Sequence, residues 1–296
     1  MRSHLLTVGL TPTWQRVLCF EALAVGAVNR TSRVLSCAAG KSVNAAVAAK
    51  RLGAARVTAL CIVGGGADEQ RFVYDVASEG VELCAVRGES ELRTCTTLLE
   101  GDGRATELVQ NAGPESTTTL EALRAQHERL VRDASLQLLC GSLPQGAPAT
   151  LYRDLLAAAP DLPALVDARG EALAAALERE PLLVKPNRLE LAESAGIDAA
   201  DDDALERAMV DLSARGARWV LVSDGARPAR LLERGGEVER VAPLAVDRVV
   251  NPIGSGDTLL AGIAVALGRG APMRDAVTRG LEAAAANVVC ELPGRI

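Results

Sequence analysis

The segment Asn251-Pro-Ile-Gly-Ser-Gly-Asp257 places two glycines and one carboxylate at the start of an apolar, alanine-rich stretch that reads as a helix. Backbone N–H groups at the start of a helix lack intrahelical partners, and glycines let that backbone approach a phosphate closely. The spacing therefore predicts an anion-binding loop with a base, Asp257, beside it. The alternative interpretation is that Asp257 only caps the helix.

Four further polar clusters each follow a short apolar run of the kind that forms a buried strand. They are Gly141–Gly146, Asp167–Gly170, Lys185–Glu190 and Ser223–Gly225. In an open parallel sheet, ligands bind beyond the carboxyl ends of the strands. We therefore expect these clusters to surround the same ligand as the anion-binding loop.

The run Ala39-Gly-Lys-Ser42 resembles the end of a nucleotide-binding P-loop, but the first glycine of that motif would fall at Leu35. This excludes a P-loop. Lys41 remains a cation at a helix start, where a plain turn and an anion contact are both open interpretations.

Asn187 and Glu190 lie three residues apart, so a helix would place both side chains on one face. Their oxygen atoms are of the type that holds a hydrated Mg²⁺. The same spacing also occurs on ordinary helix surfaces, and that interpretation stays open.

Strands and helices that would position these residues alternate in the second half of the chain, which is typical of a parallel sheet covered by helices on both faces. We expect strands near 5–10, 56–63, 81–86, 136–140, 164–167, 182–185 and 219–223, and helices near 42–52, 72–77, 148–159, 171–178, 187–195, 203–215, 257–262 and 271–290.

A second, smaller set of strands is expected in the first half of the chain. Residues from about 15 to 36 alternate apolar and polar side chains without a helical period, which favours exposed antiparallel strands. Residues 94–99 and 106–109 flank Gly101-Asp-Gly103, which is a hairpin signal. This hairpin is expected to pair with the strands near 15–36, and their open edges make a homodimer possible.

The composition excludes several classes of protein. The 296 residues carry a formal charge of −6 and no basic run, so we expect no nucleic-acid partner. No run of about 18 apolar residues occurs, and the first residues are too short an apolar run for a secretory signal, so we expect no membrane partner and a cytoplasmic protein. The seven cysteines are scattered, and His4 and His127 are the only histidines that could join them in a zinc site. This pattern favours reduced thiols over zinc sites or disulfides.

The motifs also occur in a recognisable order. They are Ala39-Gly-Lys41 with Asn44, Arg93-Thr-Cys95, Gly141-Ser-Leu-Pro144, Lys185-Pro-Asn187 with Glu190-Leu191, and Asn251–Asp257. In this order the sequence resembles the PfkB branch of the ribokinase-like sugar kinases over nearly its whole length. Within that branch it is most similar to tagatose-6-phosphate kinases and 1-phosphofructokinases.

This resemblance implies a three-layer α/β/α sandwich with a mostly parallel central sheet and a small β lid. It implies a single ribokinase-like domain, 1–296, with lid strands from about 11–36 and 88–112. The implied reaction is the ATP-dependent phosphorylation of a sugar phosphate, such as tagatose 6-phosphate or a fructose 1- or 6-phosphate, with Mg²⁺ as a cofactor.

The resemblance also implies a role for each matching residue. The catalytic group comprises Asp257, as the base that takes the hydroxyl proton, with Gly254, Ser255 and Gly256 as backbone donors to the transferring phosphoryl group. The acceptor would meet Gln15, Gly40, Lys41, Asn44, Arg93 and Ser142, with Lys41 and Arg93 on its phosphate. ATP would meet Lys185, Asn187, Ser223, Gly225, Gly254, Gly256 and Asn287. Asn187 and Glu190 would hold Mg²⁺, largely through water.

Two positions depart from the family pattern. After the first strand, relatives carry Asn-Pro-x-x-Asp with an aspartate that grips sugar hydroxyls, whereas this chain has Thr11-Pro-Thr-Trp-Gln15. An amide replaces the carboxylate, which changes both charge and hydrogen-bonding geometry. Ser42 replaces the glycine that follows Gly-Lys in the family. Both changes bear on the acceptor and leave the phosphoryl-transfer residues intact.

Three other functions compete with this prediction. The nearest is a kinase for an unphosphorylated sugar or nucleoside, which would give Lys41 and Arg93 no anion to meet. A non-catalytic sugar or nucleotide sensor is the second, although a binder has no need for a base at Asp257. A dinucleotide-dependent oxidoreductase is disfavoured because no G-x-G-x-x-G follows the first strand.

Overall fold

The computed structural model describes residues 3–296, which form two β-sheets and nine α-helices. In chain order the elements are β1 (His4–Gly9), β2 (Thr13–Phe20), β3 (Val34–Ala39), α1 (Lys41–Arg51), β4 (Arg56–Val63), α2 (Glu69–Ser78), β5 (Glu82–Arg87), β6 (Arg93–Glu100), β7 (Ala105–Val109), α3 (Thr117–Leu130), β8 (Leu136–Cys140), α4 (Leu151–Ala157), β9 (Ala164–Asp167), α5 (Gly170–Leu177), β10 (Leu183–Val184), α6 (Arg188–Ala195), α7 (Asp202–Ala214), β11 (Trp219–Asp224), β12 (Arg227–Glu233), β13 (Val238–Val241), α8 (Ser255–Gly268) and α9 (Met273–Val288).

The large sheet has nine strands in the order β13-β12-β11-β10-β9-β8-β1-β4-β5. All neighbours from β11 to β5 pair in parallel, and β12 and β13 extend that edge as antiparallel strands. Strands that run in parallel end at one common edge, so the loops that follow β8, β9, β10 and β11 open toward the same space.

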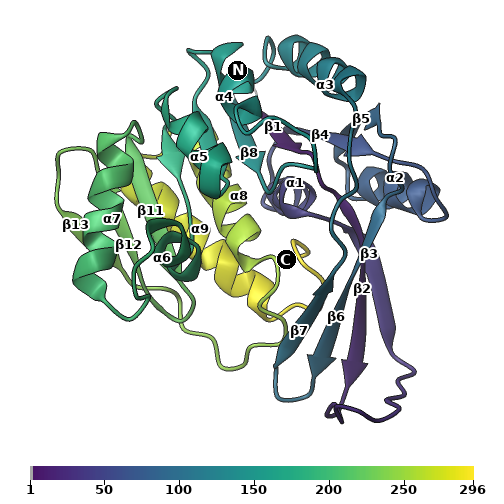
Figure 1. Cartoon of the computed structure of the whole chain (residues 1–296). Helices are drawn as coiled ribbons and strands as arrows, with labels where there is room; N and C mark the ends of the chain where they lie inside the picture. The colour runs from purple at the N-terminus through teal and green to yellow at the C-terminus, as the bar shows by residue number, and fades with distance from the viewer. Residues whose placement is uncertain (1–2) are drawn as a thin grey trace.

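Helices cover both faces of this sheet, which confirms the predicted three-layer sandwich (Figure 1). One buried cluster joins the sheet to α1, α2, α8 and α9, and the other joins it to α3, α4, α5, α6 and α7. Neighbouring side chains of one strand enter opposite clusters, as Leu5 and Leu6 of β1 do. Both faces of the strands are therefore buried, which explains their continuous apolar runs.

The small sheet has the order β3-β2-β6-β7 and projects from one side of the sandwich (Figure 1). We call these four strands the lid. The predicted hairpin is β6–β7, and its predicted pairing with the earlier strands occurs between β6 and β2, in parallel. The tip of the hairpin touches the segment before α8, where Arg248 Nη2 donates to the carbonyl of Gly101 at 2.9 Å.

Two features were not predicted from the sequence. The first is helix α3. Ser116 caps it by accepting from the Thr119 N–H, and the buried Leu120, Leu123 and Leu130 lie on one face of the helix. The second feature is the β12–β13 hairpin at the sheet edge. No helix within residues 3–296 is long and apolar enough to span a bilayer.

Candidate active site

A cavity of about 840 Å³ lies where the carboxyl ends of the parallel strands meet the lid and the start of α8. Every residue predicted for the site lines this cavity, except Asn287. Those that line it are Gln15, Gly40, Lys41, Asn44, Arg93, Ser142, Lys185, Asn187, Glu190, Ser223, Gly225, Gly254, Ser255, Gly256 and Asp257.

The anion-binding loop ends at Gly254, which adopts φ 82° and immediately precedes the first turn of α8. A side chain at this position would collide with Pro293, because a Cβ atom built there would lie 2.5 Å from its ring. Asn251 holds the start of the loop by donating to the carbonyl of Glu291 at 2.8 Å and accepting from the N–H of Ile253 at 3.0 Å. The first turn of α8 therefore lines the cavity, although the N–H of Ser255 donates to the carbonyl of Pro252 at 3.3 Å.

Asn287 supports this loop from behind, so the geometry does not support its predicted contact with ATP. Its amide nitrogen donates to the carbonyl of Ile253 at 2.9 Å, and its amide oxygen accepts from the hydroxyl of Thr258 and the N–H of Gly294. The side chain is buried and absent from the cavity wall. Its hydrogen-bonding capacity is used within the protein.

Asp257 lies in the first turn of α8, but it is not the helix cap, because the capping position is Gly254 and no side chain caps this helix. Its carboxylate Oδ2 instead accepts from Asn44 Nδ2 at 2.7 Å. Burial raises the pKa of Asp257 to about 6, against the opposing effect of the Lys41 ammonium and the Asn44 hydrogen bond. The carboxylate is therefore ionised at neutral pH and able to accept a proton.

Asn44 has a second feature that bears on a ligand. Its amide oxygen is buried and has no hydrogen-bond partner among residues 3–296. Leaving a buried acceptor unpaired costs about 1–3 kcal/mol. The amide nitrogen, by contrast, is the atom of Asn44 that faces Asp257.

Asp167 belongs to a polar cluster that was expected near the ligand, but no role was predicted for it, and it lies at the centre of the site. The buried carboxylate accepts from Lys41 Nζ at 2.7 Å and pairs with Lys185 Nζ at 3.0 Å. Burial alone would raise the pKa of Asp167, but the two ammonium groups hold it below its usual value. The sequence could have indicated this role, because Asp167 is a carboxylate at the carboxyl end of a buried strand.

Lys41 also reaches the third carboxylate of this group, with its ammonium 3.4 Å from Glu190 Oε1. Burial would lower the pKa of Lys41, but Asp167, Asp257 and Glu190 raise it above its ordinary value. The two lysines therefore face three carboxylates around the anion-binding loop.

Asn187 and Glu190 form a capping box at the start of α6. Asn187 Oδ1 accepts from the Glu190 N–H at 2.8 Å, and Glu190 Oε2 accepts from the Asn187 N–H at 2.9 Å. Asp167, Asn187 and Glu190 are oxygen donors of the type Mg²⁺ takes, but each is already engaged by protein groups. They do not form a cage of protein ligands, and a Mg²⁺ ion held through water by Asn187 and Glu190 stays a prediction.

On the lid side of the cavity, Gln15 and Arg93 are both engaged by the protein. Gln15 Nε2 donates to the Thr97 hydroxyl at 2.8 Å, and its side chain is buried. The guanidinium of Arg93 donates to the carbonyls of Thr11 at 2.7 Å and Gln110 at 3.1 Å. Arg93 therefore ties the lid to the loop after β1 and lines the cavity at the same time.

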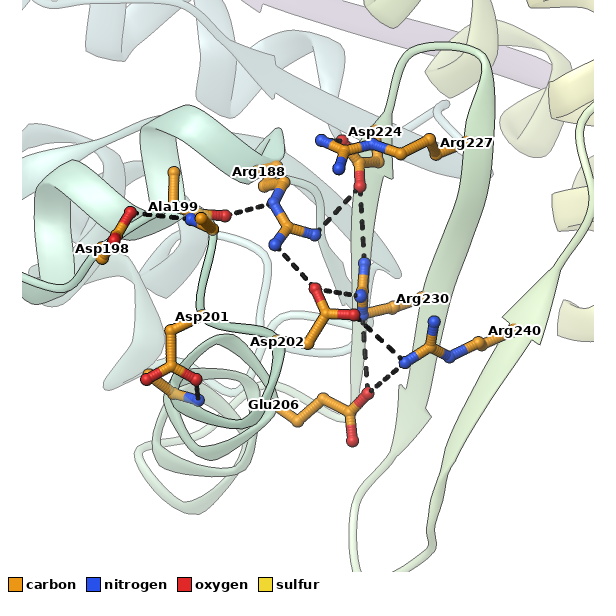
Figure 2. A network of polar contacts seen from close by, with 12 residues as sticks. Arg188, Asp198, Ala199, Asp201, Asp202, Glu206, Asp224, Arg227, Arg230 and Arg240 are labelled. Carbon is orange, nitrogen blue, oxygen red and sulfur yellow. Dashed lines mark hydrogen bonds and ion pairs between the residues drawn. The ribbon is translucent and has the colours of Figure 1, made fainter.

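At the opposite end of the cavity lies the turn between β11 and β12, which carries Ser223 and Gly225. A network of ion pairs stands behind this turn (Figure 2). Asp224 accepts from Arg188 Nη1 at 3.1 Å and from Arg227 Nη2 at 2.8 Å. These ion pairs were not predicted, since nothing in the local sequence indicates that α6, α7 and the β11–β12 turn meet here.

Comparison with known proteins gives a match to one family model, described as pfkB family carbohydrate kinase, over residues 3–294. Phosphofructokinase-2 from Escherichia coli in complex with fructose-6-phosphate is similar in structure, with a TM-score of 0.87 at 24% identity, over 99% of this chain and 96% of that chain. A possible 1-phosphofructokinase from Thermotoga maritima gives a TM-score of 0.88 at 20% identity, over 98% and 93%. Arabidopsis thaliana ribokinase complexed with ribose and ATP gives a TM-score of 0.74 at 20% identity, over 99% of this chain and 95% of that chain. The structural likenesses show a ribokinase-like fold.

Proposed function

We propose that this chain, which belongs to the pfkB family of carbohydrate kinases, transfers the γ-phosphoryl group of ATP to a hydroxyl group of a sugar phosphate. The whole chain, 1–296, would act as one ribokinase-like domain with its lid. The observation that carries the proposal is the placement of the Asp257 carboxylate on the first turn of α8, next to the N–H groups of Gly254–Gly256.

In the proposed reaction, Asp257 takes the proton from the attacking hydroxyl as the new O–P bond forms. The pKa of about 6 suits this role, because a general base works best when its pKa is near the working pH. Asn44, which lines the cavity and donates to the Asp257 carboxylate, holds that carboxylate in place for the acceptor.

The transferring phosphoryl group would be held by charge and by backbone donors. The start of α8 and the Lys185 ammonium lie together, because a Cβ atom added at Gly256 would be 3.4 Å from Lys185 Nζ. Mg²⁺, held through water by Asp167, Asn187 and Glu190 and directly by ATP, would supply the charge that the lysines lack.

A phosphorylated acceptor is proposed because two cations that the family resemblance assigns to the acceptor phosphate, Lys41 and Arg93, both line the cavity. Either would have to exchange protein partners for phosphate oxygens when the acceptor binds. The Escherichia coli relative is described with fructose-6-phosphate and the Thermotoga maritima relative as a possible 1-phosphofructokinase, so hexose phosphates of this type are the first acceptors to test. Tagatose 6-phosphate joins them on the sequence resemblance.

The test is an acceptor screen with Mg-ATP, in which free and phosphorylated forms of tagatose and fructose are compared as matched pairs. We expect kcat/KM to favour the phosphorylated form by at least about tenfold, because one charge-assisted contact contributes about 1.5–3 kcal/mol. We expect Asp257→Asn to lower kcat by about 10²–10⁴. Equal use of free sugar would favour the simple sugar kinase, and nucleotide binding without any turnover would favour the non-catalytic sensor.

A further inference from the structure

Two arginines lie almost fully buried behind the turn that ends β11, and their charges are matched by carboxylates from other elements (Figure 2). The side chains of Arg188 and Arg230 are 5% and 3% exposed. Asp224, at 6%, is their buried counter-ion. A buried guanidinium without partners is strongly unfavourable, so these three side chains must remain together in the folded protein.

The network joins four elements, α6, α7, β11 and β12. Arg188 is the first residue of α6 and donates to Asp224 Oδ2 at 3.1 Å and to Asp202 Oδ1 at 2.6 Å. Arg230 of β12 contacts the same two carboxylates, at 3.5 Å and 2.7 Å. Asp202 opens α7 and is 45% exposed, whereas Asp224 is buried at the end of β11.

Only the Asp224 side of the network faces the cavity. Arg188, Asp224 and Arg227 line it, and Asp202, Glu206 and Arg240 do not. The turn itself is tied to α6, because Ser223 forms a β-bridge with Asn187. The β11–β12 pairing is irregular between Val222 and Asp224, so the ladder alone does not define the conformation of this turn. The buried arginines supply the constraint that is missing there.

Asp224 divides its two oxygen atoms between two tasks. Oδ2 is held from behind by the buried arginines, and Oδ1 accepts from Arg227 Nη2 at 2.8 Å. The Arg227 side chain is 66% exposed and stands on the cavity wall. A long, exposed arginine normally samples many rotamers, so this contact orders a cation that would otherwise be mobile.

We propose that Asp224, fixed by Arg188 and Arg230, is a positioning residue that sets the Ser223–Gly225 turn and aims the Arg227 guanidinium at a phosphate of the bound nucleotide. This rests on the proposed function, because it takes the nucleotide to be the ligand at this end of the cavity. A guanidinium that is already oriented loses less freedom on binding, which increases affinity for the phosphate.

The test compares Asp224→Asn with Asp202→Asn. Both changes remove one negative charge and a contact to the same two arginines, but only Asp224 reaches the cavity. Binding of ADP and of adenosine is measured by calorimetry, and unfolding by urea. We expect Asp224→Asn to weaken ADP binding about 10- to 100-fold and adenosine binding far less. Asp202→Asn should lower stability and leave both affinities within about threefold of wild type.

Equal loss of ADP affinity in the two variants, or none in Asp224→Asn, would overturn the proposal, since the network would then serve stability alone. Arg227→Ala covers the case in which Asp224→Asn fails to fold, because Arg227 is largely exposed. It should weaken ADP binding at least about tenfold, with Arg240→Ala, an exposed arginine on the outer side of the network, as the unchanged control. A wild-type protein that binds neither ADP nor an ATP analogue would refute the proposed function itself, and this inference with it.

Discussion

The Asp257 carboxylate is held between opposing influences, and their balance determines its reactivity. Burial favours the protonated form, while the Lys41 ammonium and the Asn44 amide favour the charged form. The result is a pKa of about 6, high for an aspartate and still below neutral pH. Such a group is ionised before the reaction and basic enough to take a proton during it.

Asn44→Leu should move this balance in a predictable direction. The amide of Asn44 donates to the ionised carboxylate, so its loss raises the pKa of Asp257 further. We expect the acidic limb of the kcat/KM profile, which lies near pH 6 in wild type, to shift to higher pH, with activity therefore lost at milder acidity. Rates above about pH 8, where Asp257 is ionised in both proteins, separate this effect from lost acceptor contacts. An acidic limb that stays in place would show that Asn44 does not tune the base.

Among the elements, α8 and α9 make an unusually close contact beneath the catalytic turn. A Cβ atom added at Gly262 of α8 would lie 2.8 Å from the Cα atom of Gly280. One added at Gly280 of α9 would lie 2.6 Å from the carbonyl oxygen of Leu259. The two glycines let the backbones approach, and this packing sets the position of the helix that carries Asp257.

Gly280→Ala should therefore destabilise the protein despite the better helix propensity of alanine. The propensity gain is about 1 kcal/mol, whereas overpacking against a backbone carbonyl costs about 1–3 kcal/mol and more where the helix cannot move. We expect a net loss of about 1–2 kcal/mol in the urea unfolding free energy. Thr278→Ala, at an exposed position of α9, is the control and should change stability by less than about 0.5 kcal/mol. A stabilised Gly280→Ala variant would show that the two helices have room to separate.

For the whole molecule, the lid presents two different faces. Gln15 of β2, Cys95 of β6 and Glu107 of β7 line the cavity. The side chains that alternate with them along each strand lie on the opposite face of the lid. The outward face carries apolar side chains that are exposed or only partly covered, namely Leu18, Val34, Leu98 and Leu108. Such a face, on a sheet with open edges, suits the lid of a second copy of the chain.

A homodimer through the lid would bury this face, so Leu108→Asp should weaken the dimer. Sedimentation velocity over a range of concentrations should show a dimer for wild type and a shift toward monomer for the variant, by at least about tenfold in the dissociation constant. Val210→Asp changes an equally exposed apolar residue on α7 and should leave the dimer intact. A wild-type protein that is monomeric at every concentration, or a variant that dimerises as well as wild type, would exclude the lid as the interface.

The local sequence was sufficient to predict the layers, the strands of the lid and the helix start at Gly254–Asp257, because each depends on signals within one segment. Apolar runs and glycines mark the strands and their ends, and the Gly254–Asp257 spacing marks a helix start suited to phosphate. Helix α3 has a comparable local signal from Ser116 to Leu130, but it was not among the predicted helices.

Contacts between distant segments were decided only by tertiary structure. Lys41 and Asp167 are 126 residues apart, and Asn44 and Asp257 are 213 apart, yet each pair forms a hydrogen bond of 2.7 Å. The pKa of Asp257 and the place of Asn287 behind the loop likewise depend on which side chains pack around them. Residue types and spacing indicate which groups can do chemistry, but burial and the partners brought by the parallel sheet determine their charge, their orientation and whether they reach the cavity.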